Sequence, residues 1–182
     1  TIDFGEDAVI SVKLASDATG EVVITVNGED YTAAIENGVA SVTVSDLKAD
    51  DYTVEVKYAG DNNYNEAAGS AEFSVLKITP EMDVVVDGTV FGEDLTIDVS
   101  LPADATGKVV ITVNGEDYTA AIENGVASVT VSGLEAGDYT VSVKYAGDDN
   151  YNAAEVTKGV NVAKAQPVLG VVIADVDYGN GF

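Results

Sequence analysis

The chain has 182 residues, and its 32 acidic and 8 basic residues give it a formal net charge of −24. Affinity for nucleic acid and for anionic lipid comes from basic residues, so we expect no nucleic-acid partner and no membrane insertion in this segment. Cys and His are absent, which excludes disulfides and argues against zinc sites and His-activated nucleophiles. The 46% of apolar residues indicates a folded protein despite the charge.

Apolar and polar residues alternate along most of the chain, and no stretch has a helical period. In the first half the alternating runs lie at residues 8–14, 22–26, 31–35, 40–44, 52–58 and 73–75. Val, Thr and Tyr are enriched in these runs, and a two-residue period with such residues predicts half-buried strands. Short strands joined by short turns, at about seven strands per domain, predict an all-β fold of antiparallel β-sandwiches.

Asn-Gly pairs separate several of the runs. The pairs are Asn27-Gly28 and Asn37-Gly38, and the first returns later as Asn114-Gly115. Both central residues of a type I′ turn need a positive φ, which Asn and Gly tolerate. We therefore expect structural turns at these pairs and a three-stranded meander over residues 21–45.

A Tyr follows a Leu by five residues in two places. The stretches "DLKADDYTVEV" and "GLEAGDYTVSV" put Tyr52 and Tyr139 at the start of a strand. This arrangement resembles the tyrosine corner of immunoglobulin-like sandwiches, whose hydroxyl binds upstream backbone. Val54 and Val141 stand where antibody domains carry their second Cys, so we expect apolar packing in place of that disulfide.

An acidic stretch occurs twice, as "YAGDNNYN" and as "YAGDDNYN". Calcium takes six to eight oxygen ligands, which acidic loops supply, and this makes Asp61, Asp148 and Asp149 candidate calcium ligands. The ordered Asp-x-Asp-x-Asp-Gly spacing of a calcium loop is missing. No other cofactor is expected.

The same stretch also fits a turn between the last two strands of a sandwich. Asp and Asn bond to nearby backbone and accept left-handed geometry, so they favour turns. In that interpretation Tyr64 and Tyr151 fold down over the open end of the sandwich, each with its polar tip in water. We favour the structural turn over the calcium site.

The chain repeats itself. Residues 19–65 return at 106–152, 87 positions later, with six differences, all of them polar residues or Gly. The differing pairs are Glu21/Lys108, Asp46/Gly133, Lys48/Glu135, Asp50/Gly137, Glu55/Ser142 and Asn62/Asp149. Self-similarity of this strength indicates an array of like domains.

The phase of the repeat predicts the domain boundaries. "KITPEMDVVVDGTVFGED" returns as "KAQPVLGVVIADVDYGNG", whereas the opening "TIDFGED" matches only the end of that segment. We therefore predict a repeat without its first strand at 1–77, a complete repeat at 78–164 and the first strand of a third repeat at 165–182. The chain has no initiator Met and no targeting segment, which indicates a piece of a longer protein.

Four motifs together carry a family resemblance: "G-x-V-x-I-T-V-N-G-x-x-Y-T-A", "N-G-V-A-S-V-T-V", "L-x-A-x-D-Y-T-V" and "Y-A-G-D-x-N-Y-N". They resemble the group 3 bacterial immunoglobulin-like (Big) repeat of adhesin-like surface proteins of methanogenic archaea and bacteria, over nearly the whole chain. The resemblance implies tandem Greek-key sandwiches arranged like beads on a string, in an extracellular module at the cell surface. It implies no catalytic residues, so we expect no enzyme.

The leading functional hypothesis is mechanical: a segment of a cell-surface stalk or fibre whose partners are neighbouring repeats. A second hypothesis follows from the repeat phase, because an empty strand position and a spare strand allow donation from one copy to the next in a filament. A third is an adhesin domain that binds glycans or proteins. For that hypothesis the candidate exposed aromatics are Tyr64, Tyr151 and Tyr178.

Overall fold

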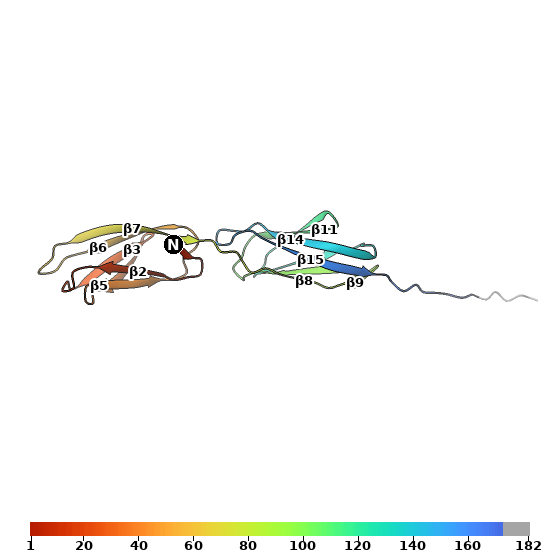
Figure 1. The fold of residues 1–182 in the computed structure, drawn as a ribbon, viewed down its shortest axis with the longest axis horizontal. Coiled ribbons are helices and arrows are strands. Elements are labelled where there is room, and N and C mark those ends of the chain that lie inside the picture. The colour runs from red at the N-terminus through yellow and green to blue at the C-terminus, as the bar shows by residue number, and fades with distance from the viewer. Residues whose placement is uncertain (173–182) are drawn as a thin grey trace, which may run out of the picture.

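The computed structural model describes residues 1–172, and it consists of two β-sandwiches joined end to end (Figure 1). The strands of the first sandwich are β1 (Ile2–Asp3), β2 (Ala8–Lys13), β3 (Glu21–Val26), β4 (Glu29–Ala34), β5 (Val39–Val44), β6 (Asp51–Tyr58) and β7 (Ala67–Leu76). Those of the second are β8 (Asp83–Val86), β9 (Thr89–Val90), β10 (Leu95–Ser100), β11 (Lys108–Val113), β12 (Glu116–Ala121), β13 (Val126–Val131), β14 (Gly137–Tyr145) and β15 (Ala154–Ala163). The all-β, immunoglobulin-like prediction is confirmed.

Each sandwich has two layers. In the first, a five-stranded sheet in the order β1-β7-β6-β3-β4 packs on the pair β2-β5. In the second, the five strands β12-β11-β14-β15-β9 pack on the three strands β13-β10-β8. All pairings within the sheets are antiparallel except β1 with β7 and β9 with β15, which are short and parallel.

The core of each sandwich follows the alternation in the sequence. On β11 the side chains of Val109, Ile111 and Val113 are at most 1% exposed, while the residues between them face outward. Val54 and Val141, on the equivalent strands β6 and β14, are also buried. Burying an aliphatic side chain contributes about 1.5–3 kcal/mol, so rows of this kind hold each sandwich together without disulfides.

The predicted meander over residues 21–45 is wrong. Strands β3 and β4 form a hairpin through Asn27 and Gly28, as expected, but β5 pairs with β2 in the opposite sheet. Asn37 and Gly38 have positive φ, as a type I′ turn requires, yet they carry the chain across the sandwich. A turn of this type fixes only the local reversal of the chain, and burial of the next strand decides the sheet that it joins.

The segment before Leu95 is divided between the two sheets. Strand β8 pairs with β10, and after Asp87 and Gly88 the chain crosses to the other sheet, where β9 pairs with β15. A Cβ on Gly88 would lie 2.9 Å from the carbonyl oxygen of Asn161, so the crossing needs Gly. The first sandwich has β1 at the position of β9, but the strand equivalent to β8 is not among its seven strands.

The crossing turn of the second sandwich supplies a test. Gly125→Ala is expected to destabilise the protein by about 3 kcal/mol, because the residue has a φ of 78° and its Cβ would meet the carbonyl oxygens of Leu101 and Pro102 at 2.5 Å and 2.8 Å. Gly115→Ala is the matched control. Its φ of 80° is equally unfavourable for Ala, but nothing lies within 4 Å of the new Cβ. We therefore expect this variant to lose only about 1–2 kcal/mol of the free energy of unfolding. Equal losses in chemical denaturation would contradict the packing argument.

Candidate functional site: the joint between the sandwiches

A carboxylate organises the loop between the last two strands of each sandwich. In the second sandwich Asp148 accepts hydrogen bonds from the backbone N–H groups of Thr106, Asn150 and Tyr151 at 2.8–2.9 Å, and from the Thr106 hydroxyl at 2.9 Å. In the first sandwich Asp61 accepts the same four bonds from Thr19, Asn63 and Tyr64. These carboxylates therefore fasten a β-turn to the loop that precedes β3 or β11.

The same bonds lower the pKa values of both carboxyl groups. Partial burial of Asp148 would by itself raise its pKa, but the hydrogen bonds from Thr106 and Asn150 outweigh it and hold that pKa far below its ordinary value. The backbone N–H groups of Thr19 and Asn63 lower the pKa of Asp61 in the same way. Both groups are ionised throughout the physiological range, and they stabilise the turns as anions.

The two tyrosines of these loops lie in different surroundings. Tyr151 is 5% exposed, because Phe4 of the first sandwich packs against it edge to face with ring centroids 5.5 Å apart. Its hydroxyl donates to Asp104 at 2.8 Å, and burial together with this bond raises the pKa of Tyr151 to about 12. Tyr64 is 36% exposed and donates to Asp17. The polar tips predicted to lie in water thus bind carboxylates, and Tyr151 is not a free aromatic surface in this chain.

The linker between the sandwiches is held by the Asp148 loop. The Lys77 ammonium donates to the carbonyl of Asp148 at 2.6 Å, and the backbone of Ile78 bonds with Asn150 and Asn152. The side chain of Asn152 also donates to the Lys77 carbonyl. These bonds fix the chain as it leaves β7 and before it enters β8.

Asn150 connects this loop directly to the body of the first sandwich. Its side-chain oxygen accepts the backbone N–H of Ala49 at 3.1 Å, across 101 residues of sequence. The sequence analysis missed Asn150, Asn152 and Phe4 as contact residues. An aromatic residue recurs at the position of Phe4 as Phe91 and Tyr178, and this recurrence was the one available indication.

Two of the three calcium candidates, Asp148 and Asp149, lie at this joint, and Asp61 lies in the equivalent loop at the outer end of the first sandwich. A cleft of about 660 Å³ lies between the sandwiches, and acidic side chains line it: Asp7, Asp46, Asp104, Asp148 and Asp149. Within residues 1–172, no three acidic side chains come close enough together to form a metal site. Both Asp61 and Asp148 have their carboxylates bonded to backbone N–H groups, and Asp149 is exposed beside them.

The other predicted structural residues lie in turns and corners. The hydroxyl of Tyr52 donates to the carbonyl of Lys48 at 3.1 Å, and that of Tyr139 to the carbonyl of Glu135 at 2.9 Å. These bonds have the geometry of a tyrosine corner, four residues upstream of each ring. The pairs Asn27-Gly28 and Asn114-Gly115 have positive φ at both residues and close the β3–β4 and β11–β12 hairpins.

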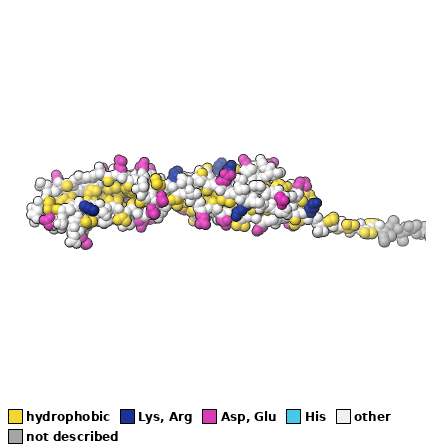
Figure 2. Space-filling model, viewed as in Figure 1, with side chains coloured by type: hydrophobic (Ala, Val, Ile, Leu, Met, Phe, Trp, Pro, Cys, Tyr) yellow, Lys and Arg dark blue, Asp and Glu magenta, His cyan; other side chains and the backbone are white. Residues whose placement is uncertain are grey.

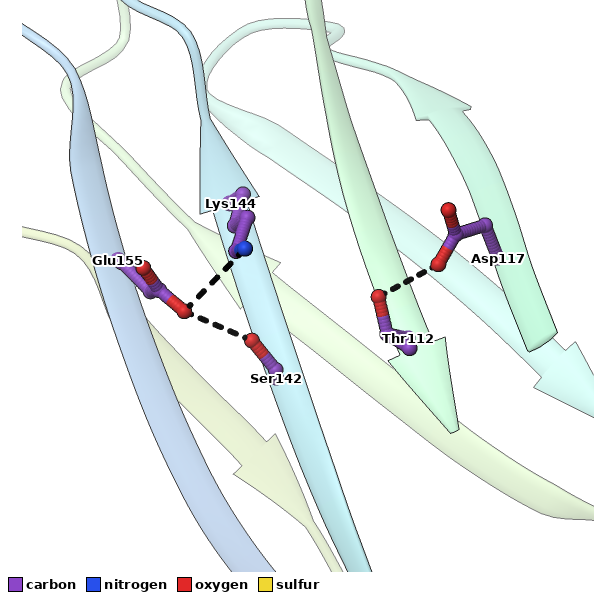
Figure 3. A network of polar contacts seen from close by, with 5 residues as sticks. All are labelled: Thr112, Asp117, Ser142, Lys144 and Glu155. Carbon is purple, nitrogen blue, oxygen red and sulfur yellow. Dashed lines mark hydrogen bonds and ion pairs between the residues drawn. The ribbon is translucent and has the colours of Figure 1, made fainter. Parts of the chain in front are cut away.

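The outer face of the second sandwich carries a small polar network (Figure 3). Glu155 on β15 accepts the Ser142 hydroxyl at 3.0 Å and lies 3.7 Å from the Lys144 ammonium on β14. On the neighbouring strands the Thr112 hydroxyl donates to Asp117 at 2.6 Å. Both ion-pair partners are more than half exposed, so this pair contributes about 0–1 kcal/mol.

An apolar groove lies along one side of the first sandwich. It measures about 590 Å³ and is lined by Ser11–Leu14 of β2 and its extension and by Ala67–Ala71 of β7. Figure 2 shows a hydrophobic strip on this sandwich, between the positions that β7 and β2 occupy in Figure 1. Ile10 and Val12 are half-buried, whereas the equivalent Ile97 and Val99 are fully buried because β8 covers them.

The segment after β15 is apolar and free of contacts over its described part. Val168, Leu169, Val171 and Val172 are 80–100% exposed, and no secondary structure forms over residues 164–172. The rest of the predicted third repeat, including Tyr178, lies outside the described residues. The groove lies beside β2, at the edge where β8 pairs with the equivalent strand β10 in the second sandwich. That residues 165–182 are the first strand of a third repeat stays a prediction.

The profile of the bacterial Ig-like domain (group 3) family matches residues 1–76 and again residues 84–163. The chain belongs to this family. Its two family units coincide with the two sandwiches, and the unmatched residues 77–83 contain the linker that the Asp148 loop holds. The family resemblance drawn from the four motifs is confirmed.

Several known proteins are similar to this pair of Ig-like units. The inverse autotransporter adhesin YeeJ of Escherichia coli (strain K12) is 25% identical over 206 residues, which cover 97% of this chain and 9% of YeeJ. The titin domains z1z2, solved in complex with telethonin, have a TM-score of 0.47 at 13% identity over 91% of this chain and 92% of that one. The Yersinia pseudotuberculosis adhesin InvE has a TM-score of 0.43 at 13% identity, over 88% and 56%.

No helix capable of crossing a membrane is found between residues 1 and 172.

The Asp148 turn generates a pH prediction. Asp148→Asn removes the anionic acceptor of Thr106 and is expected to lower the free energy of unfolding of the second sandwich by about 1–2 kcal/mol at pH 7. Because the folded-state pKa is depressed, this contribution is present above the ordinary value of 3.8 and is lost as the pH falls below it. Denaturation curves at pH 7 and pH 3 should therefore show a smaller penalty at pH 3.

Asp149→Asn is the control for this measurement. It removes the same charge from an exposed neighbour, so a change within about 0.5 kcal/mol is expected. A penalty for Asp148→Asn that is the same at both pH values would contradict the role of the ionised carboxylate.

Proposed function

We propose that the chain is a non-enzymatic segment of an extracellular, adhesin-type surface protein, in which it acts as a semi-rigid spacer. The observation that supports this is the bonded joint, where one loop of the second sandwich holds both the linker and the body of the first. Contacts between domains of one chain are often loose enough to allow relative motion. A joint with five polar bonds and an aromatic contact restricts that motion and transmits force along the array.

The composition fits this role outside the cell. The net charge of −24 keeps neighbouring stalks apart and in solution, since like-charged chains repel over about 8–10 Å at physiological salt. The chain contains no Cys, so the cores hold without disulfides. The likeness to the adhesin YeeJ supports a place at the cell surface, with neighbouring repeats as the immediate partners.

Small-angle scattering of the joint tests the spacer. Asn150→Ala removes the bond to Ala49 and is expected to broaden the distribution of angles between the sandwiches, with a shorter mean maximum dimension and little change in unfolding temperature. One such bond contributes about 1 kcal/mol. Asn63→Ala, at the equivalent position of the unoccupied loop, should leave the scattering curve unchanged at dilute concentration. An unaltered curve for Asn150→Ala would contradict the proposal of a stiff joint.

A second candidate function, filament formation by strand donation, is supported by the groove of the first sandwich. Strand β8 fills the equivalent position in the second sandwich by pairing Val84 with Val99 and Val86 with Ile97. In the repeat register, Val171 and Ile173 correspond to Val84 and Val86. A second copy therefore carries in its residues 167–176 a sequence of the right pattern for this groove.

A peptide of residues 167–176, added in excess to the dilute chain, tests donation. It should raise the unfolding temperature of the first sandwich, because moving the Val171 side chain from water into the core stabilises the complex by about 1.5–3 kcal/mol. The peptide with Val171→Asp should have no effect, since the equivalent Val84 is 3% exposed. The peptide with Val172→Asp should still bind, because the equivalent Val85 is 49% exposed. No stabilisation by the unaltered peptide would remove this candidate.

A further inference from the structure

The two outer ends of this pair of sandwiches carry the same residues as the two sides of the internal joint, except that Ala165 stands where the joint has Ile78. At the far end of the second sandwich, the residues that correspond to the docked side of the joint are Phe91, Ala136, Lys164 and Ala165, in place of Phe4, Ala49, Lys77 and Ile78. At the free end of the first sandwich, the receiving loop has Asp61, Asn63, Tyr64 and Asn65, in place of Asp148, Asn150, Tyr151 and Asn152.

The free receiving loop is already built. Its four hydrogen bonds to Asp61 match those to Asp148 one for one, with lengths of 2.7–3.0 Å. The loop therefore needs no partner to adopt its shape, and docking onto it costs little ordering.

The aromatic contact of the joint is open at both ends. Tyr64 is 36% exposed, against 5% for Tyr151 under Phe4, and Phe91 is 47% exposed. Phe91 on Tyr64 would repeat the edge-to-face pair that Phe4 makes with Tyr151.

We propose that the far end of the second sandwich of one copy docks onto the Asp61 loop of the first sandwich of another copy, in the register of the internal joint. The Lys164 ammonium then binds the Asp61 carbonyl, and Asn63 accepts the backbone N–H of Ala136. The chain that leaves this contact then continues with residues 167–172 toward the groove between β2 and β7. The inference thus deepens strand donation, on which it rests, by naming the contact that sets its register.

The two repeats differ in charge at residues of this contact. On each side, the change in one repeat matches the charge of the residue that it faces. Three of the six positions that differ between residues 19–65 and 106–152 are at the joint: Asp46/Gly133, Lys48/Glu135 and Asn62/Asp149. In the internal joint Lys48 and Asp149, of opposite charge, line the same cleft. Between two copies Glu135 replaces the lysine, and the facing loop has the neutral Asn62. Neither the internal joint nor the contact between copies therefore sets a Glu opposite an Asp, which would repel it.

A charge exchange tests the docked register. The association of the full chain would be measured by analytical ultracentrifugation in about 0.15 M salt, which screens the net repulsion. Asn62→Asp is expected to weaken association about two- to threefold, because it places a second negative charge across the contact from Glu135. Adding Glu135→Lys to Asn62→Asp should restore it, because the pair then has the charges of the internal joint. Ser128→Glu, which adds one acid to an exposed residue in the middle of β13, should have no effect.

The outcomes separate this inference from strand donation itself. Association that the peptide of residues 167–176 inhibits, but that Asn62→Asp leaves unchanged, would overturn the docked register and leave donation intact. A further control replaces Thr1 with residues 80–88, so that each chain fills its own groove and keeps Gly88 at the crossing. Association that persists in that chain and still responds to Asn62→Asp supports the docked register without donation. A native chain that stays monomeric at millimolar concentration would overturn both.

Discussion

The hydrogen bonds from backbone N–H groups to one loop carboxylate are the interaction on which the arrangement of this molecule depends. Asp148 bonds the turn between β14 and β15 to Thr106, which lies just before the start of β11. That fastening sets the directions of Asn150 and Tyr151, which then receive Ala49 and Phe4 of the first sandwich. An ionised acceptor makes such bonds stronger than neutral ones. One half-buried anion thus links the closure of a domain to its attachment to the domain before it.

The second constraint on this molecule is that one edge of strand β2 has no pairing strand. In the second sandwich the equivalent strand β10 pairs on both sides, with β13 and with β8, and its inward side chains are fully buried. In the first sandwich β2 pairs with β5, and the other edge faces the groove. Unpaired strand edges beside apolar surface tend to recruit another strand. Small side chains along β7, Ala67–Ala71, leave the space into which such a strand fits.

Repetition explains how these two features combine. Both sandwiches have the same carboxylate-bound turn, the same tyrosine corner and the same glycine, Gly38 or Gly125, where the chain crosses between the sheets. Each unit therefore offers one receiving loop and one docking end. The residues that differ are polar and several lie where units meet. A protein that stacks like units can keep its cores identical and vary only the charges at the contacts.

The sequence by itself determined the strands, the sandwich class, the tyrosine corners and the repeat register, because the two-residue period, the turn residues and the self-alignment are local properties of the chain. It did not determine the sheet that β5 joins, since Asn37-Gly38 reverses the chain equally well within a sheet or between sheets. It also did not reveal Asn150 and Phe4 as joint residues, although both are plain in the sequence. Only the tertiary structure decided these points, because they depend on which surfaces meet across 101 residues of chain, and no local pattern specifies a contact at that separation.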